Sequence, residues 1–234
     1  MKPDQLALAP MWYVVFLLSL TCHEGAHGLA AKLGGDLTAF EGGQVTLNPI
    51  PHMRREPFGT ILFPVLSYFM SGWMMGWASA PFDPRWAQRH PRRAAWMALA
   101  GPAANLILVL IAALAIRVGI AWRIFAMPSS AGFTHIVDAP NGGVAEGAAT
   151  LLSILFSLNL LLAVFNLFPM PPLDGITALG VFLPERAALR VAQWGHNPAL
   201  MLLGIVIAWQ AFGYIFDPLF TLGLNLLYPG HSYH

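Results

Sequence analysis

The hydrophobic residues of this chain gather into long continuous runs, unlike the alternating or one-sided patterns of soluble strands and helices. Five runs are about as long as the ~20 residues that a helix needs to cross a bilayer. They lie at about 7–31, 58–80, 94–116, 148–168 and 198–215. A further apolar piece, 218–228, is too short to cross alone. The pattern predicts an all-α polytopic membrane protein with about four to five transmembrane helices.

The polar stretch between the first two runs carries two short segments with strand-like sequences. Leu37–Phe40 (LTAF) and Gln44–Leu47 (QVTL) are joined by EGG, a combination typical of a turn. We therefore predict a short β-hairpin at the membrane surface. The connection at 117–147 contains PSS, AP and NGG, which predict an irregular exposed loop.

The 58–80 run is interrupted by one proline and two glycines, which predicts a re-entrant segment rather than a regular span. The basic residues favour the same interpretation. If all five runs cross, Lys and Arg divide seven against five between the two sides. If 58–80 returns to its own side, they divide nine against three, with Lys2, Arg117 and Arg123 opposite the rest. The positive-inside rule favours the second arrangement.

The composition is typical of a membrane protein and limits the classes of partner that we expect. Of the 234 residues, 57% are hydrophobic and 10% are charged, against about 25% charged in soluble domains. Membrane lipid is therefore an expected partner. The formal net charge is +1, without the basic excess typical of nucleic-acid binding, so we expect no nucleic-acid partner. The single cysteine, Cys22, cannot form an intrachain disulfide.

The end of the first run contains the motif H-E-x-x-H, formed by His23, Glu24 and His27. On a helix, positions i and i+4 share one face with Cβ atoms about 5–6 Å apart, so both imidazoles can bind one zinc ion. Glu24 is suited to act as a base towards metal-bound water. A carboxylate at the centre of a spanning helix costs about 2.5–3.5 kcal/mol, which a metal site would offset. Because cleavage near Ala31 would remove this motif, we expect residues 1–31 to be retained.

A catalytic zinc needs a third protein ligand and an open position for water. Asp174 is the leading candidate because it follows the 148–168 run in FNLFPMPPLDG, where prolines unwind the backbone and Gly175 permits a sharp turn. A plain surface turn would give the same pattern. His52 is the next candidate. The remaining candidates for the third ligand are Asp36, Glu41, Asp83, His90 and His135.

Topology favours Asp174. For it to meet the two histidines, the chain must cross the membrane an even number of times between them. The runs 94–116 and 148–168 give two crossings, which suffices only if 58–80 does not cross. The charge count and the metal geometry therefore require the same arrangement.

Three motifs together resemble the site-2 protease family, intramembrane zinc metalloproteases that cleave membrane-spanning segments of other proteins. They are HEGAH, GPAAN at 101–105 and FNLFPMPPLDG at 165–175. LNPIPH, GTILFP and MGWASAP resemble a bacterial branch of that family without a PDZ domain. The resemblance implies a single domain, 1–234, with a catalytic core at about 7–180 and a C-terminal helix or helices at 198–228.

The resemblance also implies the site. One zinc ion per chain is expected on His23, His27 and Asp174, with Glu24 as general base. Asn166 is expected to position substrate or stabilise the oxyanion, although bonding the unwound backbone near the prolines fits this amide equally well. A transmembrane protein substrate is the expected partner. The expected location is the bacterial cytoplasmic membrane, with the active site towards the cytoplasm.

A substrate helix hides its carbonyls in its own hydrogen bonds, so an unwound segment needs an edge on which to pair. The residues that we predict to supply this edge are Gln44, Val45, Thr46 and Leu47.

Two positions depart from the family pattern, Ser79 where relatives often carry lysine and Ile176 where a second glycine is common. The alternative functions are a membrane zinc-binding transporter and a non-proteolytic membrane metalloprotein. The paired repeats typical of transporters are not visible in the sequence.

Overall fold

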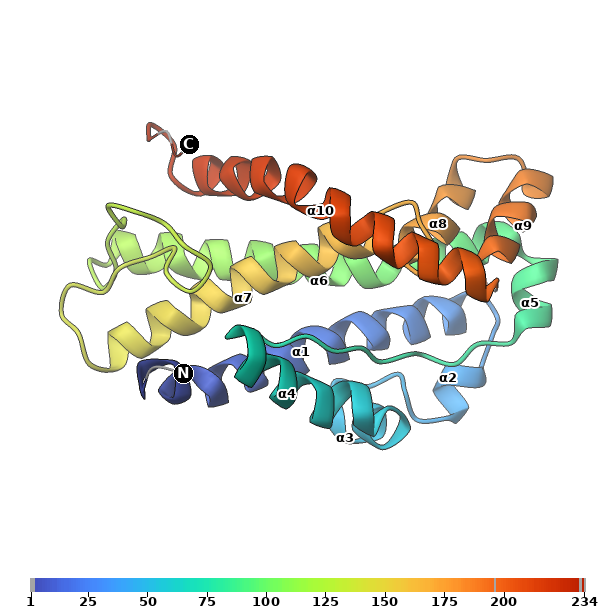
Figure 1. Cartoon of the computed structure of the whole chain (residues 1–234), viewed down its shortest axis with the longest axis horizontal. Coiled ribbons are helices and arrows are strands. Elements are labelled where there is room, and N and C mark those ends of the chain that lie inside the picture. The colour runs from blue at the N-terminus through green and yellow to red at the C-terminus, as the bar shows by residue number, and fades with distance from the viewer. Residues whose placement is uncertain (1–2, 196, 232, 234) are drawn as a thin grey trace.

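The computed structural model describes residues 3–195, 197–231 and 233. In this part of the chain four helices are long and apolar enough to cross a membrane. They are α1 (Pro3–Leu33), α6 (Pro91–Ala121), α7 (Val144–Asn166) and α10 (Pro198–Leu227). Figure 1 shows them running along the long axis of the molecule. The chain is thus a helical membrane protein with four candidate spans, and residues 198–227 form one helix that includes Pro218.

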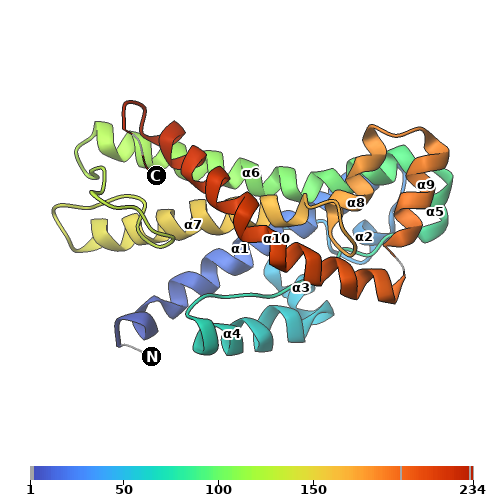
Figure 2. The same cartoon turned by 45° about the horizontal axis from the view of Figure 1, so that its top comes forward.

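The core of the molecule is formed by α1, α6 and α7, which pack against one another. Trp12 and Phe16 of α1 meet Ile116 of α6 and Ile154 and Leu158 of α7, all at most 2% exposed. In contrast, α10 lies across α7 and leaves most of its apolar surface exposed (Figure 2). An exposed apolar face of this length is suited to lipid rather than to water.

The four long helices alternate in direction, so both chain ends lie at the same end of the molecule (Figure 1). The opposite end carries α5 (Pro84–Arg89) and α9 (Glu185–Trp194). Seven basic residues belong to these two helices, the end of α1 and the start of α6: Lys32, Arg85, Arg89, Arg92, Arg93, Arg186 and Arg190. Arg117 and Arg123 lie at or beyond the far end of α6, and Lys2 falls outside the described residues.

The 58–80 run does not form a single helix. It begins with a π-helical turn, η1 (Phe58–Leu62), and continues as α4 (Phe63–Ser71). This apolar helix is about 21 Å long at 1.5 Å per residue, short of the ~30 Å of a bilayer core. Gly72, with φ of 80°, ends it. The chain then runs extended back to α5, and Trp77 N–H donates to Gly59 C=O at 3.1 Å.

The predicted β-hairpin is wrong. The described residues contain no β-strand, and Thr38–Glu41 instead forms the short helix α2. The cause is local, because Asp36 Oδ1 accepts hydrogen bonds from the N–H and the hydroxyl of Thr38 and so starts a turn. Gln44–Leu47 then runs as a series of bends against α1, at Gly25 and Gly28.

The remaining elements are short and lie around one end of the bundle. Helix α3 (Pro49–Arg55) and helix α5 each begin with proline after a polar capping residue, Asn48 and Asp83 respectively. Helix α8 (Asp174–Ala178) continues into a 3-10 turn, η2 (Leu179–Val181). These elements surround the end of α1 that carries the H-E-x-x-H motif.

Candidate metal centre and active site

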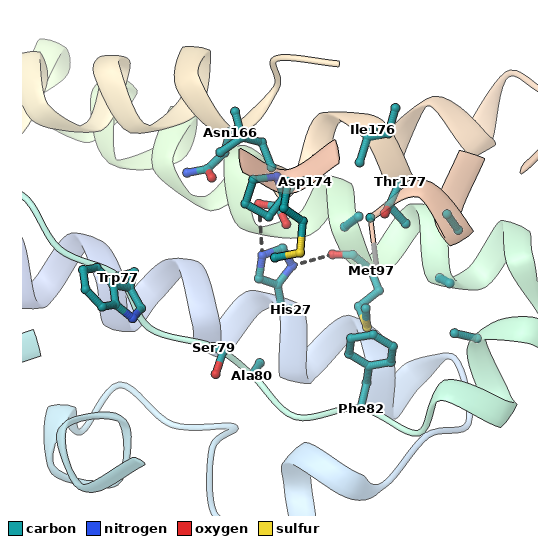
Figure 3. Close-up of a pocket in the computed structure, with 18 of the residues that line it drawn as sticks. His27, Trp77, Ser79, Ala80, Phe82, Met97, Asn166, Asp174, Ile176 and Thr177 are labelled. Carbon is teal, nitrogen blue, oxygen red and sulfur yellow. Dashed lines mark hydrogen bonds and ion pairs between the residues drawn. The ribbon is translucent and has the colours of Figure 1, made fainter. Parts of the chain in front are cut away.

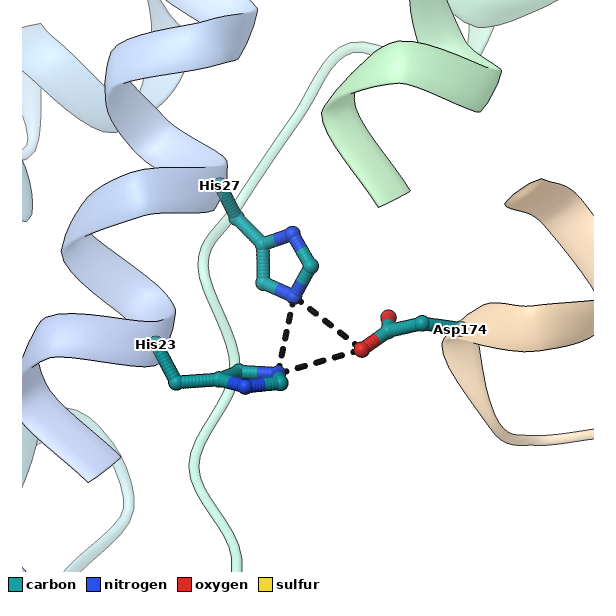
Figure 4. A group of neighbouring side chains, drawn as sticks. All are labelled: His23, His27 and Asp174. Carbon is teal, nitrogen blue, oxygen red and sulfur yellow. Dashed lines mark hydrogen bonds and ion pairs between the residues drawn. The ribbon is translucent and has the colours of Figure 1, made fainter. Parts of the chain in front are cut away.

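Three side chains from opposite parts of the chain meet at one point, with His23 and Asp174 151 residues apart in sequence. Helix α1 places His23 and His27 one turn apart on the same face, and both rings point at Asp174 of α8 (Figure 4). The two Nε2 atoms lie 3.0 Å apart. Asp174 Oδ2 lies 3.1 Å from His23 Nε2 and 3.3 Å from His27 Nε2. The predicted ligand atoms therefore converge, as the even-crossing topology requires.

This cluster fits a zinc ion. Two imidazole nitrogens and one carboxylate oxygen are a common catalytic zinc set, which leaves a fourth position open. For bonds of about 2.0–2.1 Å in tetrahedral geometry, the ligand atoms should lie about 3.3 Å apart. The observed separations of 3.0–3.3 Å agree with this value.

Helix α6 contacts the Nδ1 atoms of the two imidazoles, while their Nε2 atoms face Asp174. His27 Nδ1 donates to the backbone carbonyl of Met97 at 2.7 Å, so in the neutral ring Nε2 carries the lone pair that can bind a metal. His23 Nδ1 lies 2.6 Å from Asn105 Oδ1. Between them, Gly101 leaves the space that the rings occupy, because a Cβ there would lie 2.4 Å from His27 Nε2.

The loop after α7 delivers Asp174 by close packing. Gly175 lies inside α8 with an ordinary helical backbone, so its role is not the predicted sharp turn. A Cβ at this position would lie 2.3 Å from the Leu167 carbonyl oxygen. Burial would raise the pKa of the Asp174 carboxyl, but the neighbouring His27 and His23 lower it below its usual range. The carboxylate is therefore ionised, as a metal ligand must be.

Glu24 lies beside the cluster and faces a cavity. Its side chain is 5% exposed and lines a space of about 1020 Å³ together with His23, His27 and Asp174. The other walls are mostly apolar and include Met97, Phe82 and Trp77 (Figure 3). This volume is at the upper limit of the ~300–1,000 Å³ of ordinary ligand pockets, large enough for a segment of polypeptide.

Asn166 ends α7 and also lines this cavity (Figure 3). Its Nδ2 donates to the Leu162 carbonyl, 3.0 Å away and one turn back in the same helix. The amide therefore does not bond the unwound backbone near the prolines through this donor, and its oxygen is the group available for other roles.

The four residues predicted to bind substrate lie elsewhere. Within the described structure, none of Gln44–Leu47 lines the cavity. Thr46 C=O contacts the α1 backbone at Gly25 and accepts a hydrogen bond from His52 Nε2 at 3.2 Å. Their role in substrate binding stays a prediction, and a loss of cleavage in Thr46→Pro would support it.

The other candidate ligands do not reach the cluster. His52 is 2% exposed and packs against the Gln44–Leu47 segment. Asp36 accepts from Thr38 and from Asp83 N–H, and His135 pairs with Asp138 in the 122–143 loop. Asp174 is thus the carboxylate that the described structure brings to the two histidines.

Sequence reasoning missed the groups that support the ligands. Met97 acts through its backbone carbonyl, which leaves no signal in a sequence. Asn105 and Asn159 are polar residues inside apolar helices, and that feature could have indicated a functional role. The extended segment that carries Trp77 was predicted as part of a re-entrant stretch and as a family motif, but not as a wall of this cavity.

Fold and cluster together define a helical membrane protein with a largely buried His-His-Asp cluster that could hold a metal ion. The family model of peptidase family M50 matches residues 11–209. No solved structure matches the chain.

Two curated proteins illustrate the relationship. The chain is 31% identical over 233 residues to "Putative zinc metalloprotease YwhC" of Bacillus subtilis, covering 92% of this chain and 96% of that protein. It is also 31% identical over 191 residues to "Putative zinc metalloprotease Rip2" of Mycolicibacterium smegmatis, covering 80% of this chain and 64% of that protein. The chain therefore belongs to peptidase family M50, the site-2 protease family, and is a metalloprotease. This assignment favours the enzyme over the transporter and the non-proteolytic metalloprotein.

Proposed function

We propose that this chain is an intramembrane zinc endopeptidase that cleaves membrane-spanning segments of protein substrates. The observation that carries the proposal is the position of the His23, His27 and Asp174 cluster. It lies against a mostly apolar cavity between the membrane helices, at the end of α1. A site of this kind suits an apolar polypeptide segment better than a soluble peptide.

In this proposal one zinc ion per chain is held by His23, His27 and Asp174. When bound, zinc supplies a Lewis acid that activates water and polarises a carbonyl. Glu24 would accept a proton from the attacking water on its carboxylate and pass it to the leaving amine. Asn166 offers its oxygen or a reoriented amide to the substrate backbone. The apolar walls exclude bulk water and so strengthen each of these interactions.

The arrangement in the membrane follows from charge and length. We place the basic end of the molecule, with α5 and α9, at the cytoplasmic face of a bacterial cytoplasmic membrane. The active site then lies towards the cytoplasm. Helix α4 and the extended segment after Gly72 form the re-entrant element, because α4 is too short to span and the chain returns beside it.

The test is cleavage of a defined membrane substrate by the full-length protein in proteoliposomes. The probe is a single-span test protein with a glycine-weakened transmembrane helix and a tag at each end. Wild type should cut a bond inside that helix, mapped by mass spectrometry. Glu24→Gln should keep its zinc and lose at least ~100-fold in rate, because the proton acceptor is gone.

Glu41→Gln, a change of an exposed glutamate on α2, is the matched control and should cleave as wild type does. Unchanged cleavage in Glu24→Gln, or cleavage confined to the soluble parts of the probe, would overturn the proposal.

A further inference from the structure

A chain of buried polar groups leads away from the metal cluster through three helices. His23 Nδ1 lies 2.6 Å from Asn105 Oδ1. Asn105 Nδ2 donates to Asn159 Oδ1 at 2.8 Å, and Asn159 Nδ2 donates to Ser19 Oγ at 2.9 Å. Ser19, Asn105 and Asn159 are 0% exposed. Polar groups are costly inside apolar helices, so such a chain calls for a function.

The direction of these hydrogen bonds begins at α7. Asn159 Nδ2 lies 2.8 Å from the Leu155 carbonyl, which can only accept, so the amide nitrogen must face it. The Ser19 hydroxyl donates to the Val15 carbonyl at 2.7 Å and is therefore free to accept from the same amide. Two backbone carbonyls thus fix the orientation of Asn159 and turn its Oδ1 towards Asn105.

The orientation of Asn105 follows. Its Nδ2 faces two acceptors, Asn159 Oδ1 and the Ser19 carbonyl at 3.4 Å, so its Oδ1 must face His23. That oxygen can only accept, and His23 Nδ1 therefore carries the proton. In the neutral ring, His23 Nε2 then carries the lone pair and faces His27 and Asp174.

The same tautomer is set at His27 by the Met97 carbonyl. When both rings are neutral, three lone-pair atoms therefore converge within 3.3 Å: His23 Nε2, His27 Nε2 and Asp174 Oδ2. In this protonation state the arrangement is favourable around a cation.

We propose that Asn105 and Asn159 are positioning residues that hold His23 in the Nδ1-protonated tautomer, with Nε2 ready to bind metal. The inference rests on the proposed role of His23 as a ligand. Partners of this kind, one step behind a ligand, typically change metal affinity by 10–100-fold when removed.

The test measures zinc affinity of the full-length protein in detergent by competition with a chromophoric chelator. Asn159→Leu keeps the size of the side chain and removes its hydrogen bonds, so Asn105 is free to turn. We expect affinity to fall at least ~10-fold, and ~10–100-fold in Asn105→Leu, where the acceptor itself is removed. The d–d absorption of the Co²⁺-loaded protein should change in both variants, because the coordination of His23 changes.

Two variants separate positioning from packing. Asn159→Asp, protonated when buried, keeps a donor and an acceptor and should restore affinity to near the wild-type value. Ser157→Ala removes a buried hydroxyl on the same helix that has no hydrogen-bond partner among the described residues. It should bind zinc as wild type does.

Zinc affinity in Asn159→Leu equal to that of Ser157→Ala would overturn the inference, and so would an Asn159→Asp variant as weak as Asn159→Leu. His23→Ala distinguishes this failure from that of the proposed function. If His23→Ala keeps zinc with wild-type affinity, the ligand assignment itself is wrong. If it loses zinc while Asn159→Leu does not, only the positioning role fails.

Discussion

At the residue scale, the candidate metal centre depends on the α6 residues that contact the histidine rings as much as on the ligands themselves. Gly101 leaves the space for two imidazoles, and Asn105, one turn further along α6, sets the proton on one of them. The GPAAN motif thus leaves room for the two imidazole rings at Gly101 and provides a hydrogen-bond acceptor for His23 at Asn105. A larger side chain at Gly101 would collide with the imidazole rings, and a change at Asn105 would remove the hydrogen bond to His23.

That His23 and His27 share one face could be predicted because H-E-x-x-H encodes its geometry within one helix. That Asp174 lies beside them could be predicted from the proline-rich segment around it, from topology and from the family resemblance. The hydrogen bonds from Asn105 to His23 and to Asn159 could not be predicted from the sequence. They depend on how α1, α6 and α7 are rotated about their axes when they pack together. Gly175 shows the same limit, since its close approach to Leu167 is a property of packing.

Gly101→Ala should abolish metal binding. Its Cβ would lie 2.4 Å from His27 Nε2 and 2.6 Å from His23 Nε2, where no carbon can be accommodated. Zinc retained after size-exclusion chromatography should fall to near zero, and cleavage should be lost with it. Gly147→Ala on α7 is the control, since its Cβ would meet only Met11 Cε, at 3.5 Å. A Gly101→Ala protein that keeps its zinc would contradict the geometry.

At the element scale, the cavity depends on how its surrounding segments are tied together. Gly204 of α10 lies so close to the loop before α8 that a Cβ there would sit 1.9 Å from the Pro171 carbonyl oxygen. On the other side, Asp36 joins the turn after α1 to the start of α5 by accepting from Thr38 and Asp83. These contacts fix both walls around the metal cluster.

The helical spans could be predicted from length and hydropathy, but strand-like composition was not enough to predict the structure of residues 37–47. Strand propensity needs a partner to pair with, and Gln44–Leu47 packs on a helix instead. The turn that Asp36 starts at Thr38 overrides the strand-like composition of LTAF. The break in the 58–80 run, in contrast, could be expected from its proline and glycines, and its re-entrant course in the membrane stays a prediction.

Gly204→Ala should weaken cleavage by displacing the loop that carries Asp174. The new Cβ cannot share space with the Pro171 carbonyl, so α10 and the loop must separate. We expect at least a ~10-fold loss in rate, in the range that a displacement of about 1 Å causes in a catalytic site. Gly213→Ala on the same helix, with nothing within 4 Å of its Cβ, should match wild type. Equal rates in the two variants would show that this contact does not hold the loop.

Asp36→Asn should destabilise the protein in a pH-dependent way. Burial raises the pKa of Asp36, but the hydrogen bonds from Thr38 and Asp83 lower it by more than burial raises it, so the pKa lies below its ordinary value. The stabilisation is therefore full above the ordinary aspartate pKa of about 3.9 and is lost as the pH falls through the folded value. At pH 7 the variant should be less stable by about 1–3 kcal/mol.

The measurement is the thermal midpoint in detergent at pH 7 and near pH 3. The difference between wild type and Asp36→Asn should shrink at the lower pH, whereas Glu41→Gln should show no difference at either. A gap that stays constant with pH would show that the carboxylate charge at Asp36 is not responsible.

At the scale of the whole molecule, the four candidate spans alternate in direction, with both ends of the chain at one end of the molecule and helices α5 and α9 at the other (Figure 1). The sequence could predict the spans because hydrophobic length decides which helices can cross a bilayer, and the orientation, which rests on charge, stays a prediction. It could not place α10 across α7. Nor could it show that the 122–143 loop is partly buried, with Phe133 stacked on Trp12 at 5.6 Å and on Phe220 at 6.4 Å.

Cysteine labelling tests this orientation. In a Cys22→Ser background, Ser130→Cys in the 122–143 loop and Glu185→Cys at the start of α9 both place an exposed thiol. An impermeant maleimide added to intact bacterial spheroplasts should label Ser130→Cys at once and Glu185→Cys only after permeabilisation. Labelling of both from outside, or the reverse order, would contradict the proposed topology.

The measurement that tests the account most directly is the metal content of the purified protein. Wild type, Glu24→Gln, His23→Ala and Asp174→Ala would be compared after identical purification. We expect about one zinc per chain in the first two and near none in the last two, because the ligands are two imidazoles and one carboxylate. If Asp174→Ala kept its zinc tightly while His23→Ala lost it, the third ligand would lie elsewhere and the proposed site would be wrong.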